Sequence, residues 1–132
     1  MKNGKIIIKN TTRRHYELVV SIVNFNSSKI SPILALLLKA LSTISQKFNL
    51  LVVVVDNDST DGSLEAIKRL VLVNQLDSLI VKLSNNYGFA IANNIAYRVA
   101  LSISKFDYFA LLNPDAIPYP PSICLLYTSP SP

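Results

Sequence analysis

The sequence has one cysteine, three glycines and no tryptophan among its 132 residues. Because Cys124 is alone, an internal disulfide and a thiolate metal site are both excluded, and a reduced, cytoplasmic location is expected. The scarcity of glycine argues against folds in which several glycines bring the backbone close to a cofactor. In agreement with this, the sequence contains neither the G-x-G-x-x-G run of a dinucleotide oxidoreductase nor a P-loop.

Long apolar runs and acidic residues are also scarce. The longest apolar stretch, residues 33–38, is far short of the roughly 20 residues of a membrane helix, and residues 1–9 do not have the pattern of a secretory signal. The net charge is +5, and five of the 13 basic residues fall in a leader, residues 1–16, that contains no acid. We expect this leader to be a frayed, solvated terminus, with peripheral contact to an anionic membrane surface as the alternative. Nucleic-acid binding is not expected, because aromatic residues do not interleave with the basic ones.

Two kinds of apolar segment alternate along the rest of the chain. Hydrophobic residues make up 50% of the sequence and charged residues 16%, which is typical of a chain that folds around a core. Short, β-branched runs predict strands at residues 18–23, 50–55, 79–83 and 108–112. Apolar residues at helical spacing predict helices at residues 31–44, 64–71 and 89–103. The first helix is expected to begin with Ser31 as its cap, followed by Pro32.

The repeat of strand, helix and strand, at a spacing of roughly 30 residues, is typical of βαβ units. Right-handed crossovers then place helices on both faces of a parallel sheet. The predicted fold class is therefore α/β, with a doubly wound, mostly parallel sheet in a domain of residues 17–123. Residues 124–132 are rich in proline and serine and show no periodicity. We expect either a foreign tail, where the true reading frame stopped, or a genuine Pro-rich loop.

Polar residues follow each predicted strand, and parallel strands bring their carboxyl ends to one edge of the sheet. The candidates for a binding site at this edge are Asn24, Asn26, Asp56, Asp58, Asn86, Gly88, Asn93, Asn113 and Asp115. Each of these residue types alone is also common in turns. In the same region, Asp61 or Ser63 is expected to cap the next helix, and a structural role is expected for Asp61. The position of the whole set at one edge, rather than any single residue, indicates a binding site.

The chemistry of four candidates narrows the kind of ligand. Asp115, just past a buried strand, suits a hard divalent cation that holds a diphosphate. Asp56 is placed to accept a hydrogen bond from the imide N–H of a nucleobase. Gly88 would allow a positive backbone angle or the close approach of a ligand. Asn93 stands one turn inside a helix, where asparagine is a poor helix former, so it serves either a ligand or a buried hydrogen bond to the loop.

Four ordered segments of this sequence resemble the front part of the family 2 glycosyltransferases, which have the GT-A fold. They are residues 20–26, 55–63, 86–90 and 112–115. The Asn-Pro-Asp form of the last segment is most similar to the rhamnosyltransferase-like branch. The resemblance implies transfer of a sugar, with inversion, from a UDP- or dTDP-sugar to a hydroxyl of a saccharide or lipid-linked acceptor. The setting that it implies is the synthesis of cell-surface polysaccharide or glycolipid.

The resemblance also implies roles for individual residues. Asp115 would contact Mg²⁺ or Mn²⁺, and Asp56 would hold the nucleobase. Asn24 would line the nucleotide cleft, while Asn86 and Gly88 would approach the donor. Asn113 stands where many relatives carry another acid, so the resemblance leaves open whether Asn113 also binds the metal.

An inverting transfer needs a general base beside the acceptor hydroxyl. In the family that base comes from the second half of the domain, and no Asp, Glu or His follows Asp115 in this sequence. We therefore expect the chain to bind a donor without transferring its sugar. The alternatives are a non-catalytic nucleotide-binding remnant or an unstable fragment. A sugar nucleotidyltransferase is less favoured, because residues 24–28 lack the Gly- and Arg-rich first loop usual in that class.

Overall fold

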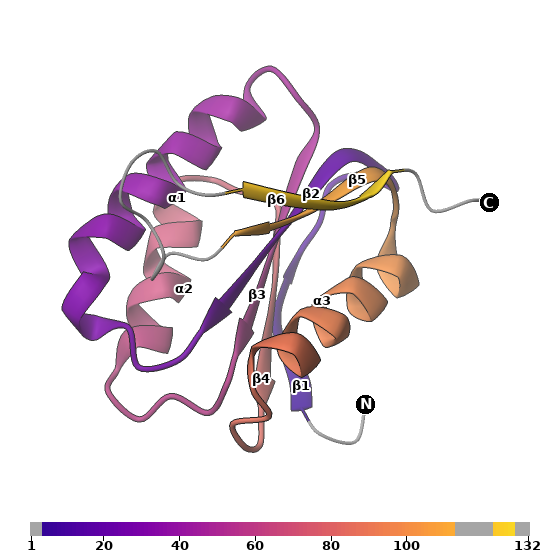
Figure 1. Ribbon diagram of the computed structural model, residues 1–132. Helices are drawn as coiled ribbons and strands as arrows, with labels where there is room; N and C mark the ends of the chain where they lie inside the picture. The colour runs from indigo at the N-terminus through magenta and orange to yellow at the C-terminus, as the bar shows by residue number, and fades with distance from the viewer. Residues whose placement is uncertain (1–3, 113–122, 129–132) are drawn as a thin grey trace.

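The computed structural model describes residues 4–112 and the backbone of residues 123–128. Strands and helices alternate along the described chain (Figure 1). The strands are β1 (Gly4–Asn10), β2 (His15–Asn24), β3 (Leu50–Asp56), β4 (Ser78–Leu83), β5 (Lys105–Leu112) and β6 (Ile123–Thr128). The helices are the 3₁₀ turn η1 (Ser28–Ile30), then α1 (Ser31–Ser45), α2 (Ser63–Val73) and α3 (Phe89–Ile103).

The strands form one mixed sheet in the order β1-β4-β3-β2-β5-β6. Strands β4, β3, β2 and β5 are parallel to one another, whereas β1 and β6 pair antiparallel at the two edges. The chain moves outward from β2 to β3 and β4, and then returns to place β5 on the other side of β2. The order of strands therefore reverses at β2, and such a switch point is where open α/β sheets form a crevice.

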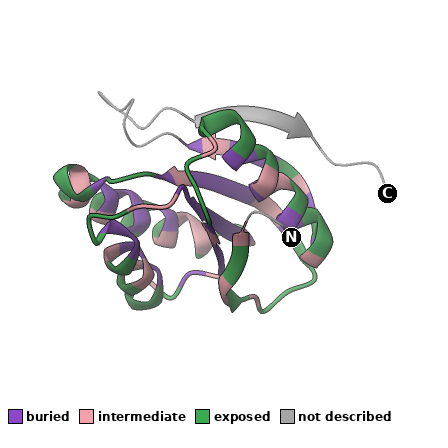
Figure 2. Cartoon of the chain, turned by 90° about the horizontal axis from the view of Figure 1, so that it is seen from below, coloured by how far each residue is buried: buried purple, intermediate pink, exposed green. Residues whose placement is uncertain are grey.

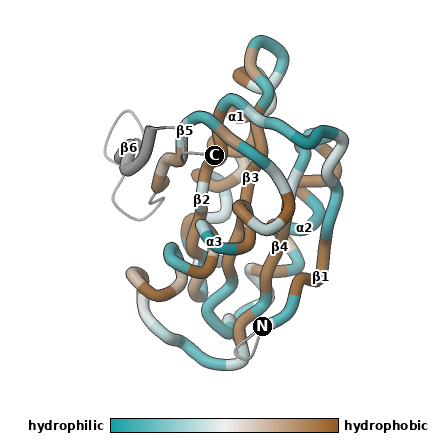
Figure 3. The backbone as a smooth tube through the Cα atoms, turned by 90° about the vertical axis from the view of Figure 1, so that its right-hand side faces the viewer, coloured by the Kyte–Doolittle hydropathy of each residue, from teal (hydrophilic) through white to brown (hydrophobic). Residues whose placement is uncertain are grey.

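Helices cover both faces of the sheet, as the sequence predicted (Figure 1). On one face, α1 and α2 bury their apolar sides against alternate residues of β2, β3 and β4. On the other face, α3 packs through small residues such as Ala92 and Ala96 against the remaining alternate residues. All residues of β3 are buried, as expected for a central parallel strand covered on both sides (Figure 2). In Figure 3 the central strands are largely brown, the colour that marks hydrophobic residues.

The first helix begins differently from the prediction. Ser31 is the first residue of α1 rather than its cap, and Ile30 at the cap position makes no side-chain hydrogen bond. The reason is that η1 adds a turn upstream, so the backbone N–H of Ile30 donates to the Ser27 carbonyl. Pro32 lies in the first turn as expected, where its missing N–H costs nothing.

The prediction of a frayed basic leader is wrong for residues 4–10. They form β1, which pairs with β4, and the β-branched residues Ile7 and Ile8 pack against the core. Gly4 permits this pairing, because a Cβ atom there would lie 2.7 Å from the carbonyl oxygen of Lys82. Strand β2 also begins earlier than predicted, at His15.

Residues 123–128, for which no element was predicted, form β6 beside β5. The expectation of a tail at residues 124–132 rested on composition and is not tested by this pairing. The strand was not predicted because these residues show no periodic pattern. An edge strand can form without one, since it pairs through backbone groups.

The amino end of the sheet is closed by a cluster around Asp77. Its Oδ2 accepts hydrogen bonds from the Tyr16 hydroxyl at 2.7 Å and from the Thr12 hydroxyl at 2.6 Å. Burial raises the pKa of Tyr16 to about 12, and the bond to the Asp77 carboxylate acts in the same direction. This end of the sheet is therefore fixed by internal contacts, and the candidate residues within residues 4–112 lie toward the other end.

Candidate functional site

The carboxyl ends of β2, β3 and β4 meet at one edge of the sheet. In the strand register, Asn24 is opposite Asp56, and Asp56 is opposite Lys82. Strand β5 reaches the same edge on the other side of β2, where Ile22 is opposite Leu112. Because α1 and α3 lie on opposite faces, the loops that leave β2 and enter α3 flank this edge from both sides (Figure 1).

Asn24 is the centre of a buried hydrogen-bond cluster at this edge. Its Nδ2 donates to Asp56 Oδ1 at 2.8 Å, and the Ser63 and Ser59 hydroxyls lie 3.0 and 3.2 Å from the same nitrogen. Its Oδ1 accepts from the hydroxyl of Ser27. The amide therefore connects β2, β3, the loop after β3 and the first residue of α2. Sequence analysis placed Asn24 at the site but missed the three serines, whose hydroxyls are common in ordinary loops.

Asp56 is completely buried, with both of its oxygens engaged. Oδ1 accepts from Asn24, and Oδ2 accepts from the backbone N–H of Ser59 at 3.0 Å. In this structure the carboxylate therefore holds the loop that follows β3. Its predicted contact with a nucleobase would use a remaining lone pair of this fixed group and stays a prediction.

Asn26 and Asp58 shape the rim of the site. Both have left-handed backbones, with φ of 47° and 62°. Asn26 Oδ1 accepts from the backbone N–H of Thr60 at 2.8 Å, which ties the loop after β2 to the loop after β3. Asp58 Oδ1 lies 3.2 Å from the ammonium nitrogen of Lys82, and this ion pair is partly exposed. Both residues thus lie at the predicted edge.

Asp61 has a structural role, as predicted, but Gly62 rather than Asp61 or Ser63 occupies the cap position of α2. Its Oδ1 accepts from the backbone N–H of Ser63 at the start of α2, and its Oδ2 accepts from the backbone N–H of Ser28 at 3.0 Å. The Ser63 hydroxyl, foremost, and these N–H groups hold the pKa of the Asp61 carboxyl well below its usual range. The carboxylate thereby joins the start of α2 to the turn before α1.

Asn57 joins the loop after β3 to the loop after β4, and it was not among the predicted site residues. Its Nδ2 donates to the Gly88 carbonyl and its Oδ1 accepts from the Tyr87 backbone N–H, both at 3.3 Å. Its own backbone N–H donates to the carbonyl of Asn24 at 2.8 Å. No pattern in the sequence distinguishes Asn57 from the other polar residues of this loop, since its partners are backbone atoms from distant segments.

Gly88 and Asn86 form the loop that enters α3. Asn86 Oδ1 accepts from the Gly88 backbone N–H at 3.0 Å, and both residues are exposed at the edge. Gly88 has φ 87° and ψ 171°, which confirms the predicted positive angle. This combination of angles is open to glycine and strained for any residue with a Cβ.

Gly88→Ala should therefore lower the free energy of unfolding by about 1 kcal/mol or more. A Cβ atom there would meet nothing within 4 Å, so the cost would arise from the backbone alone. Urea unfolding of both proteins measures the difference. Unchanged midpoints would show that the positive angle is not required.

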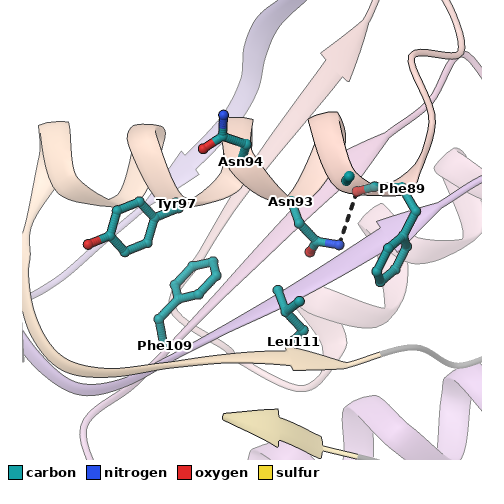
Figure 4. Close-up of a pocket in the computed structure, with 7 residues that line it drawn as sticks. Phe89, Asn93, Asn94, Tyr97, Phe109 and Leu111 are labelled. Atoms are coloured by element: carbon teal, nitrogen blue, oxygen red, sulfur yellow. Dashed lines mark hydrogen bonds between the residues drawn. The ribbon is translucent and has the colours of Figure 1, made fainter. Parts of the chain in front are cut away.

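Asn93 lies in α3 beside an apolar cavity of about 270 Å³ between α3 and β5. Figure 4 shows Asn93 beside Phe89 on α3, with Phe109 and Leu111 reaching toward α3 from β5. The Asn93 Oδ1 accepts from the buried Ser21 hydroxyl at 2.8 Å, and its Nδ2 donates to the Phe89 carbonyl at 3.1 Å. These hydrogen bonds join Asn93 to β2 and to the first residue of α3 rather than to the loop, and its contact with a ligand stays a prediction.

Asn113 and Asp115 lie outside the described residues, so the predicted metal ligand is not placed. Within residues 4–112, no group of three or more His, Cys, Asp or Glu side chains is arranged to hold a metal ion. A Mg²⁺ ion bound with a diphosphate needs only one or two protein carboxylates, because phosphate oxygens and water complete its coordination. Asp115 follows β5 in the sequence, and one carboxylate would meet that requirement.

Comparison with known proteins agrees with the geometry of this edge. The family model described as glycosyl transferase family 2 matches residues 19–129. No curated protein matches the chain significantly.

Solved glycosyltransferase structures share the fold. The Staphylococcus aureus protein TarS (residues 1–349), in complex with UDP-GlcNAc, is 25% identical, with a TM-score of 0.57 over 75% of this chain. The mannosyltransferase PcManGT from Pyrobaculum calidifontis, in complex with GDP-Man and Mn²⁺, is 25% identical, with a TM-score of 0.61 over 88% of this chain. The matched region spans 26% of the TarS chain and 32% of the PcManGT chain. Since the family model covers most of its residues, this chain belongs to glycosyltransferase family 2.

Proposed function

We propose that this chain binds a nucleoside diphosphate sugar at the carboxyl edge of β2, β3 and β4, as the donor-binding part of a metal-assisted, inverting glycosyltransferase. One observation carries the proposal. The register aligns the ends of three parallel strands, and Asn24, Asp56 and Asn57 join their loops into one buried network. A network of this kind holds backbone groups in place before a ligand arrives, which lowers the cost of binding.

Two neighbours support the chemical class of the ligand. TarS is described with UDP-GlcNAc and PcManGT with GDP-Man, so both bind a nucleoside diphosphate linked to a sugar. PcManGT is also described with Mn²⁺, which supports a divalent metal for this chain. We propose UDP- or dTDP-sugar as the donor, because Asp56 would pair with the imide N–H of uracil or thymine.

Different residues of the edge would contact different parts of the donor. Asp56 would hold the nucleobase, Asn24 would line the cleft beside it, and Asn26 and Asp58 would form the rim of the site. Asn86 and Gly88 would approach the donor from the loop before α3, where the missing Cβ leaves room for close contact. Asp115, with Asn113 beside it, would hold Mg²⁺ or Mn²⁺, which when bound neutralises negative charge on the diphosphate.

Sugar transfer is a separate claim from donor binding. General-base catalysis contributes roughly 10²–10⁴-fold to a rate, and no Asp, Glu or His follows Asp115 in this sequence. We therefore propose that this chain binds donor without turning it over. The acceptor that we propose is a saccharide or a lipid-linked hydroxyl, and the Asn-Pro-Asp motif favours the rhamnosyltransferase-like branch. The proposed location is the cytoplasm, with peripheral contact to the inner face of the membrane as a further proposal.

Mapping the ligand by NMR tests this proposal. Titration of ¹⁵N-labelled protein with UDP and Mg²⁺ should shift backbone amide signals of residues 25–28, 57–63 and 86–89. Amides at the amino end of the sheet, in residues 46–49 and 74–77, should stay in place. Shifts confined to the amino end, or no shifts at millimolar UDP, would contradict a nucleotide site at the carboxyl edge. Radiolabelled donor added to the same sample should give no transferred sugar.

A further inference from the structure

One face of helix α1 points away from the sheet and carries a regular set of exposed residues. We call this set the outer face of α1, and it includes the residues that extend the same stripe before and after the helix. Its members are Lys29, Pro32, Ile33, Leu36, Lys39, Ala40, Thr43 and Lys47, all of them exposed. Their spacing of three and four residues places them on one side of the helix. The opposite side is buried against the sheet through Leu34, Leu37, Leu38 and Leu41.

The outer face is more apolar than the surface of a helix usually is. Leu36 is 70% exposed and Ile33 is 39% exposed. The helical segment Ser28–Ser45 is the one stretch within the described residues that is long and apolar enough to cross a membrane, yet only 22% of it is buried. Because its inner side packs on β2 and β3, this segment belongs to the sheet and does not leave it to span a bilayer. Its remaining apolar character is therefore on the outside.

The charges on the outer face of α1 have one sign. No acidic residue lies between Glu17 and Asp56, so lysine is the sole charged residue type of α1 and its flanks. The neighbouring helix α2 presents the exposed Arg69, while its acid Glu65 is paired with Lys68 at 3.2 Å. Asp61, at the start of the face, accepts hydrogen bonds from the N–H groups of Ser28 and Ser63 and keeps its negative charge. Lys29, Lys39 and Lys47 on the face, with Arg69 beside it, outnumber this one unpaired acid, so the net charge around the outer face is positive.

From this combination we propose that the outer face of α1 rests on the surface of an anionic lipid bilayer. Exposed aliphatic side chains between lysines suit the boundary between acyl chains and negatively charged headgroups. Each lysine close to such a surface adds attraction that salt weakens. An acidic protein would instead require polar partners for hydrogen bonding, and the face offers only Thr43 besides its lysines. The proposal does not depend on nucleotide binding, since the face is separate from the strand-end residues.

Sedimentation with lipid vesicles tests the proposal. The protein should bind vesicles of equal parts phosphatidylcholine and phosphatidylglycerol, and should not bind vesicles of phosphatidylcholine alone. The double variant Ile33→Ser/Leu36→Ser should weaken binding about tenfold, because it removes exposed apolar area. The matched control is Leu101→Ser, since Leu101 is 43% exposed on α3 at the other face of the sheet, and it should bind like the parent protein.

A second pair of variants separates this face from general charge attraction. Lys29→Gln/Lys39→Gln/Lys47→Gln should weaken binding to anionic vesicles at least tenfold. The control Lys9→Gln/Arg98→Gln/Lys105→Gln removes the same charge from exposed positions elsewhere and should weaken it less than twofold. Equal losses in the two triple variants, or equal binding to neutral vesicles, would overturn the proposal. So would sedimentation velocity without lipid that showed a dimer lost in Ile33→Ser/Leu36→Ser, because a second copy of the chain would then cover the face.

Discussion

Replacement of Asp56 by alanine is expected to lower the free energy of unfolding by about 3 kcal/mol, with a fall in Tm of roughly 10 °C. The carboxylate is completely buried and accepts from the Asn24 amide and from the Ser59 backbone N–H. Its removal would take away the shortest hydrogen bond that the buried Asn24 Nδ2 donates, leave the half-buried Ser59 N–H without its acceptor, and open a cavity in a closed network. Circular dichroism during thermal and urea unfolding measures the change.

Two further variants make this result specific. Asp56→Asn keeps the shape and one acceptor oxygen, so it should lose less stability than Asp56→Ala. Asp107→Ala removes a partly exposed carboxylate that lies 2.9 Å from the ring of His15, and should cost less than about 1 kcal/mol. An Asp56→Ala protein as stable as the Asp107→Ala protein would show that the network is not required for folding. If Asp56 also holds the nucleobase, Asp56→Asn should reduce discrimination between UDP and ADP more than it reduces dependence on metal.

Replacement of Asp115 by alanine is expected to weaken UDP binding about 100-fold in the presence of Mn²⁺. Loss of partners that merely orient a metal ligand costs 10–100-fold in metal affinity, and loss of the ligand itself should reach the upper end of that range. Binding without metal should be unchanged, because the rest of the proposed site does not involve Asp115. Asp107→Ala, at the beginning of β5 rather than after its end, is the matched acidic control.

Most of the fold could be predicted because its signals are local. The apolar runs of β3 and β4 and the helical spacing of α3 reflect burial on both sides of the sheet, which the sequence records residue by residue. The edge strand β1 was mistaken for a frayed terminus because its lysines dominated the pattern. Its place is decided by pairing with β4, seventy or so residues away, and such long-range pairing leaves little trace in local composition.

The candidate site was predicted in outline but not in its connections. Asn24, Asn26, Asp56 and Asp58 are brought together as expected, because parallel strands end at the same edge. The links made by Asn57, Ser59 and Ser63 could not be predicted, since their partners come from other loops and include backbone atoms. Asn93 was predicted as a site residue from its unusual place in a helix. In the structure its side chain accepts a hydrogen bond from the Ser21 hydroxyl and donates one to the Phe89 carbonyl.

The central claim, metal-dependent binding of a nucleoside diphosphate, is tested most directly by calorimetric titration of UDP into this chain with Mn²⁺ and with EDTA. We expect this chain to bind UDP at least tenfold more tightly with Mn²⁺ than with EDTA. In the Asp115→Ala variant, the two affinities for UDP should be equal. Binding of equal strength with and without Mn²⁺, in the parent chain and in Asp115→Ala alike, would contradict the metal role. The absence of any UDP binding by the folded chain would contradict the nucleotide site itself.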